Sequence, residues 1–435
     1  MEAGLFRFLR FSLGLEGEVK GLLDGRKGSF DWDACYQFAK RQTLVGVLFD
    51  GIQRLPKELA PARPLLLRWL SDSESIRRRN MRMDRASAYI YNKVCAAGFR
   101  CCILKGQGNA LLYPHPSSRI PGDVDVWVMA NREELRHIAL SLTEGDGSSL
   151  LESLNHIGLT VHGVSVELHS TPALLNSPLH NSRLQRWLKR NADLQCSNRI
   201  ALPNNAGEVA VSTLSFNIIY QLCHLFHHCF YEGVGLRQIV DYYFVLKNTD
   251  FSGNTDEGAG NTDRDEVFLN TDFTDFTDRF SGNTDEGCFL LNTDCADFLD
   301  SSSGGLGEVD SGGALVALQE ELKWLGLWEF AGAVMYVLRE VMGLDEKMMI
   351  CAPDERRGRL LLEEIMAGGN FGHYDTRNHF GQGALWHNIQ RFRRDWRMLR
   401  FYPSEALSEP LFRVCHFLWR WKQKHTGKPK ERNRN

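Results

Sequence analysis

Apolar residues recur at helical spacing along most of the chain, in runs that only short polar or proline-containing stretches interrupt. Between residues 98 and 208 this period gives way to short apolar runs and strict alternation, which are typical of strands. The pattern therefore predicts helical regions on both sides of a smaller α/β core. Their expected bounds are 1–97 for the helical N-terminal region, 98–208 for the core, and 209–247 and 314–435 for the two helical parts that follow.

The first half of the core predicts two strands and a helix. A short apolar run, Phe-Arg-Cys-Cys-Ile-Leu, ends at Lys105-Gly106, where a short helix is expected to begin. The stretch Asp123-Val-Asp-Val-Trp-Val alternates strictly, so Asp123 and Asp125 should point to one side of a strand and the valines to the other. Asn131 is well placed to cap the helix expected after it.

The second half of the core predicts a hairpin. Residues 156–169 hold two strand-like runs that meet at His162-Gly163, a pair suited to a tight turn. On the second run Glu167 and His169 share one face, opposite a set of apolar residues. Together with the flanking helices, these elements predict an α+β fold built on a small mixed sheet.

Composition excludes several classes of protein. Of the 435 residues, 43% are apolar and 24% charged, which is ordinary for a globular chain and excludes a wholly disordered chain, a coiled coil and a collagen-like fibre. No window of about 18 uncharged apolar residues exists, so no membrane span is expected. The apolar N-terminus, interrupted by Arg7 and Arg10, predicts an amphipathic helix rather than a secretion signal. The eleven cysteines form no Cys-x-x-Cys pair and suggest reduced thiols in a cytoplasmic protein.

Residues 248–313 break the helical pattern and carry a concentrated negative charge. They hold 16 acidic residues against two arginines, whereas the other 369 residues carry 49 Lys/Arg and 38 Asp/Glu. Asn-Thr-Asp occurs six times in this segment, and Phe-Ser-Gly-Asn-Thr-Asp-Glu-Gly occurs twice. Such a segment has little to bury, so we expect an acidic, low-complexity, disordered insert within an otherwise basic protein.

The acidic pair of the core carries the main chemical signal. Two carboxylates on one strand face, Asp123 and Asp125, repel each other unless a cation neutralises them. Glu167 adds a third carboxylate if its strand is a neighbour. Oxygen ligands of this kind suit Mg²⁺, and two ions are expected, with Mn²⁺ as the alternative. An Asp-x-Asp pair alone is more often a solvated strand face, so the prediction depends on the residues around it.

Cationic residues lie just upstream of the acidic pair. Lys105-Gly106 occupies a strand-to-helix junction, where an ammonium and backbone N–H groups can hold phosphate. Arg119 precedes the acidic pair by a few residues and can also reach a phosphate oxygen. The ordered set of strand, Lys-Gly, helix, Arg, Gly-Asp-x-Asp and Glu-x-His strand favours phosphoryl or nucleotidyl transfer.

The same residues carry a resemblance to a known family. The stretch from Leu104 to Val128 resembles the core motif of the uncharacterised nucleotidyltransferase family in the DNA polymerase β-like superfamily, whose members show Leu-Lys-Gly, then Tyr-Pro and Arg, then Gly-Asp-Ile/Val-Asp. Val166-Glu-Leu-His resembles a later strand of that family. The resemblance implies a nucleotidyltransferase core. It also implies catalytic and metal-binding roles for Asp123, Asp125 and Glu167, and nucleotide contacts for Lys105, Gly106 and Arg119.

The resemblance implies a reaction as well. A nucleoside monophosphate would pass from an NTP such as ATP to an unknown hydroxyl of a small molecule, protein or RNA, and pyrophosphate would leave. Two alternatives stay open: a transferase acting on tRNA or other nucleic acid through the basic C-terminal region, and a non-catalytic nucleotide-binding or interaction module. The oligomeric state does not follow from the sequence.

Three further motifs have two interpretations each. Cys223-His-x-x-His-His-Cys229 resembles a zinc site, but packed or hydrogen-bonded helix histidines explain it better, and a histidine of this helix could help bind nucleotide or acceptor if the helix lies over the sheet. Arg237 either pairs with Asp241 one helical turn away or contacts phosphate. The glycine-rich residues 368–372 form either an anion-binding nest or a turn between helices.

Overall fold

The computed structural model describes residues 2–18, 30–143, 150–249, 311–375 and 384–426. The chain divides into two compact units, residues 1–249 with 319–435 and residues 250–318. The sheet and the helices around it belong to the first unit. Most of the predicted acidic insert (residues 250–310) and the end of the basic tail (residues 427–435) lie outside the described residues.

The N-terminal region is helical, as its pattern predicts. Its helices are α1 (Glu2–Ser12), α3 (Trp32–Arg41), α4 (Val45–Gln53) and α5 (Arg63–Ala96), with a short 3₁₀ turn, η1 (Lys57–Leu59). The apolar run that the sequence presents as continuous is split between α3 and α4. Thr43 adopts a positive φ of 54° there, and the buried amide of Gln42 accepts a hydrogen bond from Leu236 N and donates one to Ile365 O.

A five-stranded mixed sheet forms the core and confirms the α+β class. Its strands are β1 (Cys101–Leu104), β2 (Val124–Val128), β3 (Leu151–Glu152), β4 (His156–Val161) and β5 (Val164–His169). They lie in the order β1-β2-β5-β4-β3, and β2 and β5 are the parallel pair. The predicted hairpin turn is present, since His162 and Gly163 take φ values of 50° and 73° between β4 and β5.

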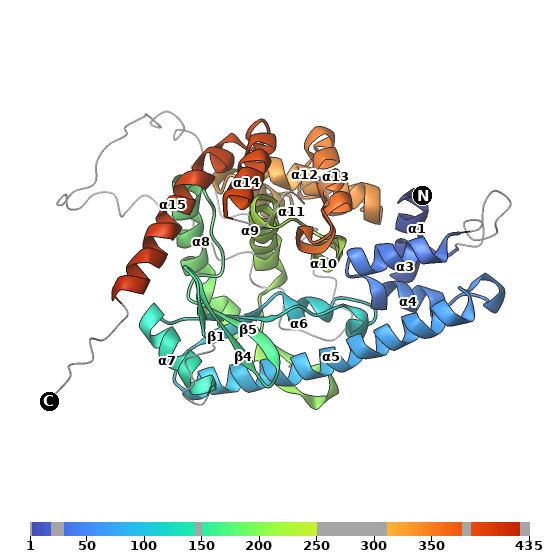
Figure 1. Ribbon diagram of the computed structural model, residues 1–435, viewed down its shortest axis with the longest axis horizontal. Helices are drawn as coiled ribbons and strands as arrows, with labels where there is room; N and C mark the ends of the chain where they lie inside the picture. Colours follow the sequence, from blue (N-terminus) through green and yellow to red (C-terminus); the bar gives the residue numbers. More distant parts are fainter. Residues whose placement is uncertain (1, 19–29, 144–149, 250–310, 376–383, 427–435) are drawn as a thin grey trace. The chain divides into compact units, whose positions relative to one another are not determined.

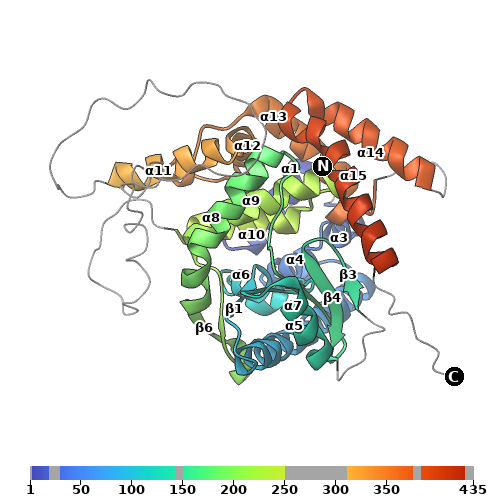
Figure 2. The same cartoon turned by 90° about the vertical axis from the view of Figure 1, so that its left-hand side faces the viewer.

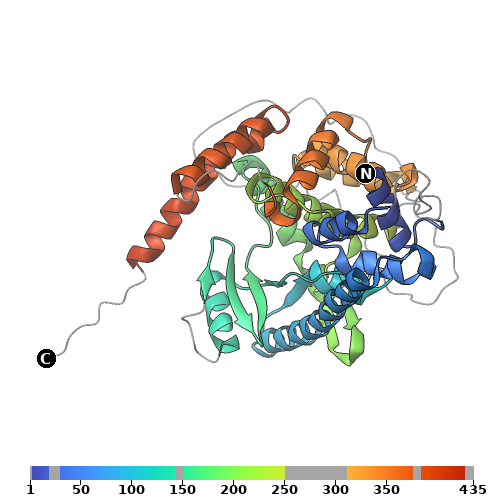
Figure 3. The same cartoon turned by 45° about the vertical axis from the view of Figure 1, so that its right-hand side comes forward.

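The two faces of the sheet have opposite character. Val124, Val126, Val166 and Leu168 are buried on one face, against α5 and α7 (Arg132–Leu142), and Figures 1 and 3 show both helices on that side of the strands. Asn131 caps α7 with a full capping box, as predicted. The carboxylates on β2 and β5, Asp125 and Glu167, therefore point to the other face, toward the helices after residue 213.

A second hairpin lies beside the sheet and corrects the boundary of the helical region. After α8 (Pro178–Ser197), strands β6 (Arg199–Leu202) and β7 (Gly207–Ala210) pair around a short 3₁₀ turn, η4 (Pro203–Asn205), and β7 packs on α5 (Figure 2). The sequence predicts helix from Val209, but a short apolar run with no flanking period fits a strand equally well. The helix begins only at Leu214.

The remaining described helices follow residue 213, and residues 311–318 belong to the second unit. Their bounds are α9 (Leu214–Tyr231), α10 (Leu236–Lys247), α11 (Ser311–Trp324), α12 (Trp328–Met342), α13 (Glu355–Gly368), α14 (Ala384–Leu399) and α15 (Pro403–Thr426). Within the described residues, no helix combines the length and apolar character that crossing a membrane requires. The nine cysteines of that part of the chain are free, and six of them are buried.

A close helix contact positions the loop that carries Arg119. Gly46 of α4 touches the backbone of Ser118 at the end of the 3₁₀ turn η2 (Pro116–Ser118), so closely that a Cβ on residue 46 would overlap the Ser118 carbonyl oxygen. We expect Gly46→Ala to lower the free energy of unfolding by about 1–3 kcal/mol through overpacking. Gly368→Ala is the control, because its new Cβ meets nothing within 4 Å. Equal melting temperatures for the two variants would contradict this contact.

Candidate active site

One pocket gathers all seven of the predicted site residues. It has a volume of about 540 Å³ and lies between the polar face of the sheet and helices α9 and α10. The seven predicted site residues that line it are Lys105, Gly106, Arg119, Asp123, Asp125, Glu167 and Arg237. They come from segments more than a hundred residues apart, so the fold brings together what the sequence leaves dispersed.

The sheet register places the three carboxylates side by side. Asp123 immediately precedes β2, Asp125 lies on it, and Glu167 is the direct neighbour of Asp125 on the parallel strand β5. One oxygen from each carboxylate fits within a group in which all atoms are within 4.8 Å of one another. Three carboxylates at this spacing form a donor set that suits a hard divalent cation.

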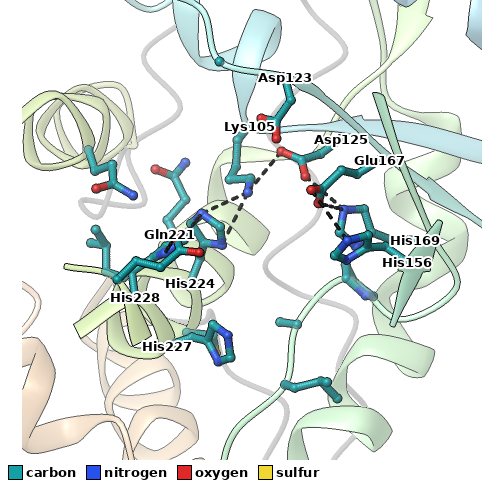
Figure 4. Close-up of a pocket in the computed structure, with 18 of the residues that line it drawn as sticks. Lys105, Asp123, Asp125, His156, Glu167, His169, Gln221, His224, His227 and His228 are labelled. Carbon is teal, nitrogen blue, oxygen red and sulfur yellow. Dashed lines mark hydrogen bonds and ion pairs between the residues drawn. The ribbon is translucent and has the colours of Figure 1, made fainter. Parts of the chain in front are cut away.

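Two cations of the chain partly balance these charges. Lys105 Nζ lies 3.1 Å from Asp125 Oδ2, and His169 Nε2 lies 2.9 Å from Asp125 Oδ1 and 3.4 Å from Glu167 Oε2. Figure 4 shows Lys105 between the carboxylates and His224. Within the described residues no ion pair reaches Asp123. Three negative charges thus face two positive ones.

The pKa values follow from this balance. The charge of Asp125, and then burial, raises the pKa of Asp123 to about 6. Burial alone would raise the pKa of Asp125, but Lys105 and His169 hold it well below its usual range. Burial alone would lower the pKa of His169, but its bonds to Asp125 and Glu167 raise it to about 9. Asp123 therefore carries the charge that lacks a partner.

Lys105 has an unusual backbone conformation at the predicted strand-to-helix junction. It follows β1 directly and precedes the short helix α6 (Gly106–Ala110), with a φ of 49°, and Gly106 has a φ of 35°. Positive φ is strained for lysine and persists where the surroundings fix it. The strand and the helix that flank this residue hold the ammonium against Asp125.

Arg119 is held by a buried acidic partner on α10. Its Nε and Nη2 donate to Asp241 Oδ1 and Oδ2 at 2.7 and 2.8 Å, and Tyr113 Oη donates to the same carboxylate at 2.7 Å. Arg119 and Asp241 are 3% and 5% exposed. The partner of Asp241 is therefore Arg119, and the i,i+4 ion pair between Arg237 and Asp241 that the spacing suggests is not formed.

Two guanidinium groups keep donor atoms free in the pocket wall. Arg237 is 7% exposed, and its Nη1 donates to Ile120 O at 2.8 Å. Among the described residues, no hydrogen-bond acceptor reaches Arg237 Nε or Arg119 Nη1, although both atoms are buried. Buried donors without an acceptor favour an anion as the missing partner. Contact of either arginine with phosphate stays a prediction.

The histidines of α9 line the pocket, where His224 contacts both Lys105 and His228. His224 Nε2 lies 3.0 Å from Lys105 Nζ and 2.9 Å from His228 Nε2, and His228 Nδ1 lies 3.1 Å from Glu232. Burial lowers the pKa of His224 well below its usual range, so this ring is neutral beside the ammonium. Among the described residues, the groups able to hold a metal do not include this segment. The interpretation as hydrogen-bonded histidines is confirmed.

Residues 368–372 form a turn, as the alternative to an anion nest predicts. Gly369 and Gly372 adopt positive φ, and a Cβ at Gly372 would overlap the carbonyl of Glu232 after α9. The turn carries Phe371 into the pocket lining, where its ring lies 5.0 Å from that of His228.

Comparison with known proteins places the chain in a family. Residues 28–259 match the family model described as "Uncharacterised nucleotidyltransferase". The chain belongs to this nucleotidyltransferase family. The matched range covers more than half of the chain and includes the strands β1, β2 and β5 with all three carboxylates. The family that the motif resembles is thus confirmed.

Other comparisons add little to the family assignment. No curated protein matches the chain. A solved structure similar to part of it is the crystal structure of an antigenic nucleotidyltransferase-like protein from Paracoccidioides brasiliensis, at 16% identity over 38% of this chain and 75% of that chain, with a TM-score of 0.25.

Several pocket residues were not singled out by sequence reasoning. His156 on β4 lies opposite His169 on β5, and its Nε2 is 3.6 Å from Glu167 Oε1. Tyr113 completes the Arg119–Asp241 group. For His156 the signal was present, because a two-residue turn at 162–163 fixes the register of the hairpin and pairs 156 with 169.

Proposed function

We propose that this chain is a cytoplasmic, metal-dependent nucleotidyltransferase that moves a nucleoside monophosphate from an NTP, with ATP as the expected donor, to a hydroxyl acceptor. The observation that carries the proposal is the composition of the pocket. Three clustered carboxylates on neighbouring strands share it with Lys105 and two buried arginines. This combination suits a polyphosphate substrate with its divalent cations. Free cysteines support a reducing compartment.

The carboxylates Asp123, Asp125 and Glu167 would hold the cations. They fit a divalent ion because all three offer oxygen ligands and because Asp123 carries a charge that no residue of the described chain pairs. We propose two Mg²⁺ ions, with Mn²⁺ as the alternative. When bound, such ions neutralise phosphate charge and favour in-line attack by a hydroxyl.

The cationic side of the pocket would bind the triphosphate. Lys105 directly follows β1, the neighbour of β2. Gly106 comes next and has no side chain to cover the backbone N–H groups at this point. Arg119 and Arg237 each offer one buried donor without a partner. These groups would hold the β- and γ-phosphates and stabilise the charge that develops on the leaving pyrophosphate.

Glu167 would accept the proton of the acceptor hydroxyl. The side chain of Glu167 is 30% exposed, whereas that of Asp125 is 9% exposed, so Glu167 is the more accessible of the two carboxylates. In the reaction the acceptor oxygen forms a bond to the α-phosphorus, the bond to the bridging oxygen breaks, and pyrophosphate leaves with the electron pair. The hydroxyl proton passes to Glu167 and then to solvent.

Replacing Lys105 by Met should change two affinities in opposite directions. The ammonium competes with a cation for Asp125 Oδ2, so Mg²⁺ alone should bind more tightly to the variant. Binding of NTP with Mg²⁺ should weaken by roughly tenfold, because one phosphate contact is lost. Titration calorimetry of full-length protein measures both. Lys189→Met, at an exposed site on α8, is the control, and two affinities that fall together would contradict this role for Lys105.

Transfer itself is tested with NTPs labelled at the α-phosphate. Full-length protein is incubated with Mg²⁺, each NTP in turn, and separate protein, RNA and small-molecule fractions of a cell extract. The proposal predicts label in one fraction with stoichiometric pyrophosphate, and neither with Asp123→Asn. Binding of an NTP without pyrophosphate release in any fraction would favour the non-catalytic module instead.

A further inference from the structure

A second group of potential ligands lies beside the three carboxylates and shares one of them. His156, Glu167 and His169 present ligand atoms that all lie within 4.8 Å of one another. The two histidines are cross-strand neighbours on β4 and β5, with ring centroids 5.2 Å apart. All three residues line the pocket, and Figure 4 shows both rings beside Glu167.

The separations within this group suit an ion better than hydrogen bonds. His156 Nε2 lies 3.6 Å from Glu167 Oε1, and His169 Nε2 lies 3.4 Å from Glu167 Oε2. Hydrogen bonds of this kind are about 2.7–3.2 Å long. Atoms that bind one cation at about 2.0–2.2 Å lie roughly 3–3.6 Å from each other. Each oxygen of Glu167 thus faces a different imidazole at the distance found between two ligands of one ion. His169 Nε2 also lies 2.9 Å from Asp125 Oδ1, so an ion bound here would replace the proton that His169 shares with Asp125.

The orientation of His156 is an independent observation that points the same way. Ser153 Oγ lies beside His156 Nδ1 at 3.5 Å, a contact longer than an ordinary hydrogen bond, and Arg132 Nη1 donates to Ser153 O at 2.7 Å. Metal-binding histidines are commonly held through the ring nitrogen that does not bind the ion. Ser153 thus lies on the Nδ1 side of the His156 ring, and Nε2 is the nitrogen that faces Glu167.

We propose that His156, Glu167 and His169 form a second cation site, for a divalent transition-metal ion such as Mn²⁺, Co²⁺ or Zn²⁺. Imidazole nitrogen is a good ligand for these ions, whereas Mg²⁺ takes oxygen ligands. The inference rests on the proposed function in one respect, because Glu167 also belongs to the carboxylate group. The pocket would then hold unlike ions, Mg²⁺ among the carboxylates and a transition metal on the histidine side.

Pulsed electron paramagnetic resonance of bound Mn²⁺ tests the site through nitrogen couplings. Tag-free, full-length protein is titrated with Mn²⁺ in the absence of nucleotide. We expect one ion coupled to two nitrogens. His156→Phe, which keeps a ring without nitrogen, should lose one coupling and at least tenfold in affinity. His137→Phe, at an exposed site on α7, should leave both unchanged, and so should His228→Phe on α9.

The outcomes separate this site from the proposed function. Mn²⁺ without nitrogen coupling in the natural protein would overturn the inference, and this result needs no variant to fold. Coupling that persists in His156→Phe or disappears in His228→Phe would overturn it as well. Asp123→Asn should keep the nitrogen signal while losing Mg²⁺-dependent NTP binding. If NTP binds in a Mg²⁺-dependent way but bound Mn²⁺ shows no nitrogen coupling, only the histidine site is wrong. If Mn²⁺ shows nitrogen coupling but no NTP binds with Mg²⁺, only the proposed function is wrong.

Discussion

Asp123→Asn should stabilise the metal-free protein and at the same time abolish transfer. Asp123 is the carboxylate without a cation partner among the described residues, so its removal relieves repulsion from Asp125. We expect a gain of about 1–2 kcal/mol in the free energy of unfolding in EDTA. The transfer rate should fall by roughly 10³-fold, equivalent to about 4 kcal/mol, because a metal ligand is lost. Melting curves and pyrophosphate release measure the two effects.

The pH dependence of the stability gain follows from the pKa of Asp123. The folded value, about 6, exceeds that of an aspartate in an unfolded chain, about 3.9. Ionised Asp123 therefore destabilises the folded state fully above pH 6, and the effect fades as the pH falls toward 4. The gain from Asn should be largest near pH 8 and absent near pH 4. A variant less stable than the natural protein at pH 8 would show that Asp123 has a structural role instead.

Asp241→Asn should cause the largest loss of stability among the substitutions considered. It removes the carboxylate that binds two nitrogens of Arg119 and the hydroxyl of Tyr113, all in a buried setting. A buried guanidinium without its counter-charge costs about 3–5 kcal/mol. Because burial alone would raise the pKa of Asp241 while Arg119 lowers it, this stability is present above pH 4 and is lost as the pH falls below it.

Two comparisons make the test specific. The double variant Arg119→Met/Asp241→Leu removes both charges and should be less destabilised than Asp241→Asn alone. Asp193→Asn breaks the exposed ion pair with Arg100 and should cost under about 1 kcal/mol. Chemical unfolding of the four proteins measures the differences. A double variant as unstable as Asp241→Asn, or more so, would contradict the importance of the uncompensated charge.

Much of the core could be predicted because its signals are local. Strict alternation defines β2, the His162-Gly163 turn defines the β4–β5 hairpin, and Asn131 with its capping box defines the start of α7. Each of these signals depends only on residues that are close together in the sequence. The same local signals placed Asp123 and Asp125 on one face of a strand.

Other features depend on distant partners and left no local signal. The division between α3 and α4 rests on Gln42, whose amide bonds to Leu236 and Ile365 far along the chain. Asp241 lies one helical turn from Arg237, but the fold offers it Arg119 from a different segment, with two hydrogen bonds. Tertiary contacts of this kind override spacing, so the sequence pattern identified the residues and missed their pairing.

The most direct test of the central claim is thermal melting of full-length protein with each NTP, in Mg²⁺ and in EDTA. We expect stabilisation by at least one NTP in Mg²⁺, about 2.7 kcal/mol at 100 times the Kd, which amounts to several degrees in melting temperature. This shift should vanish in EDTA and in Asp123→Asn. No shift with any NTP, or an equal shift in EDTA and in the variant, would contradict a metal-dependent nucleotide site in this pocket.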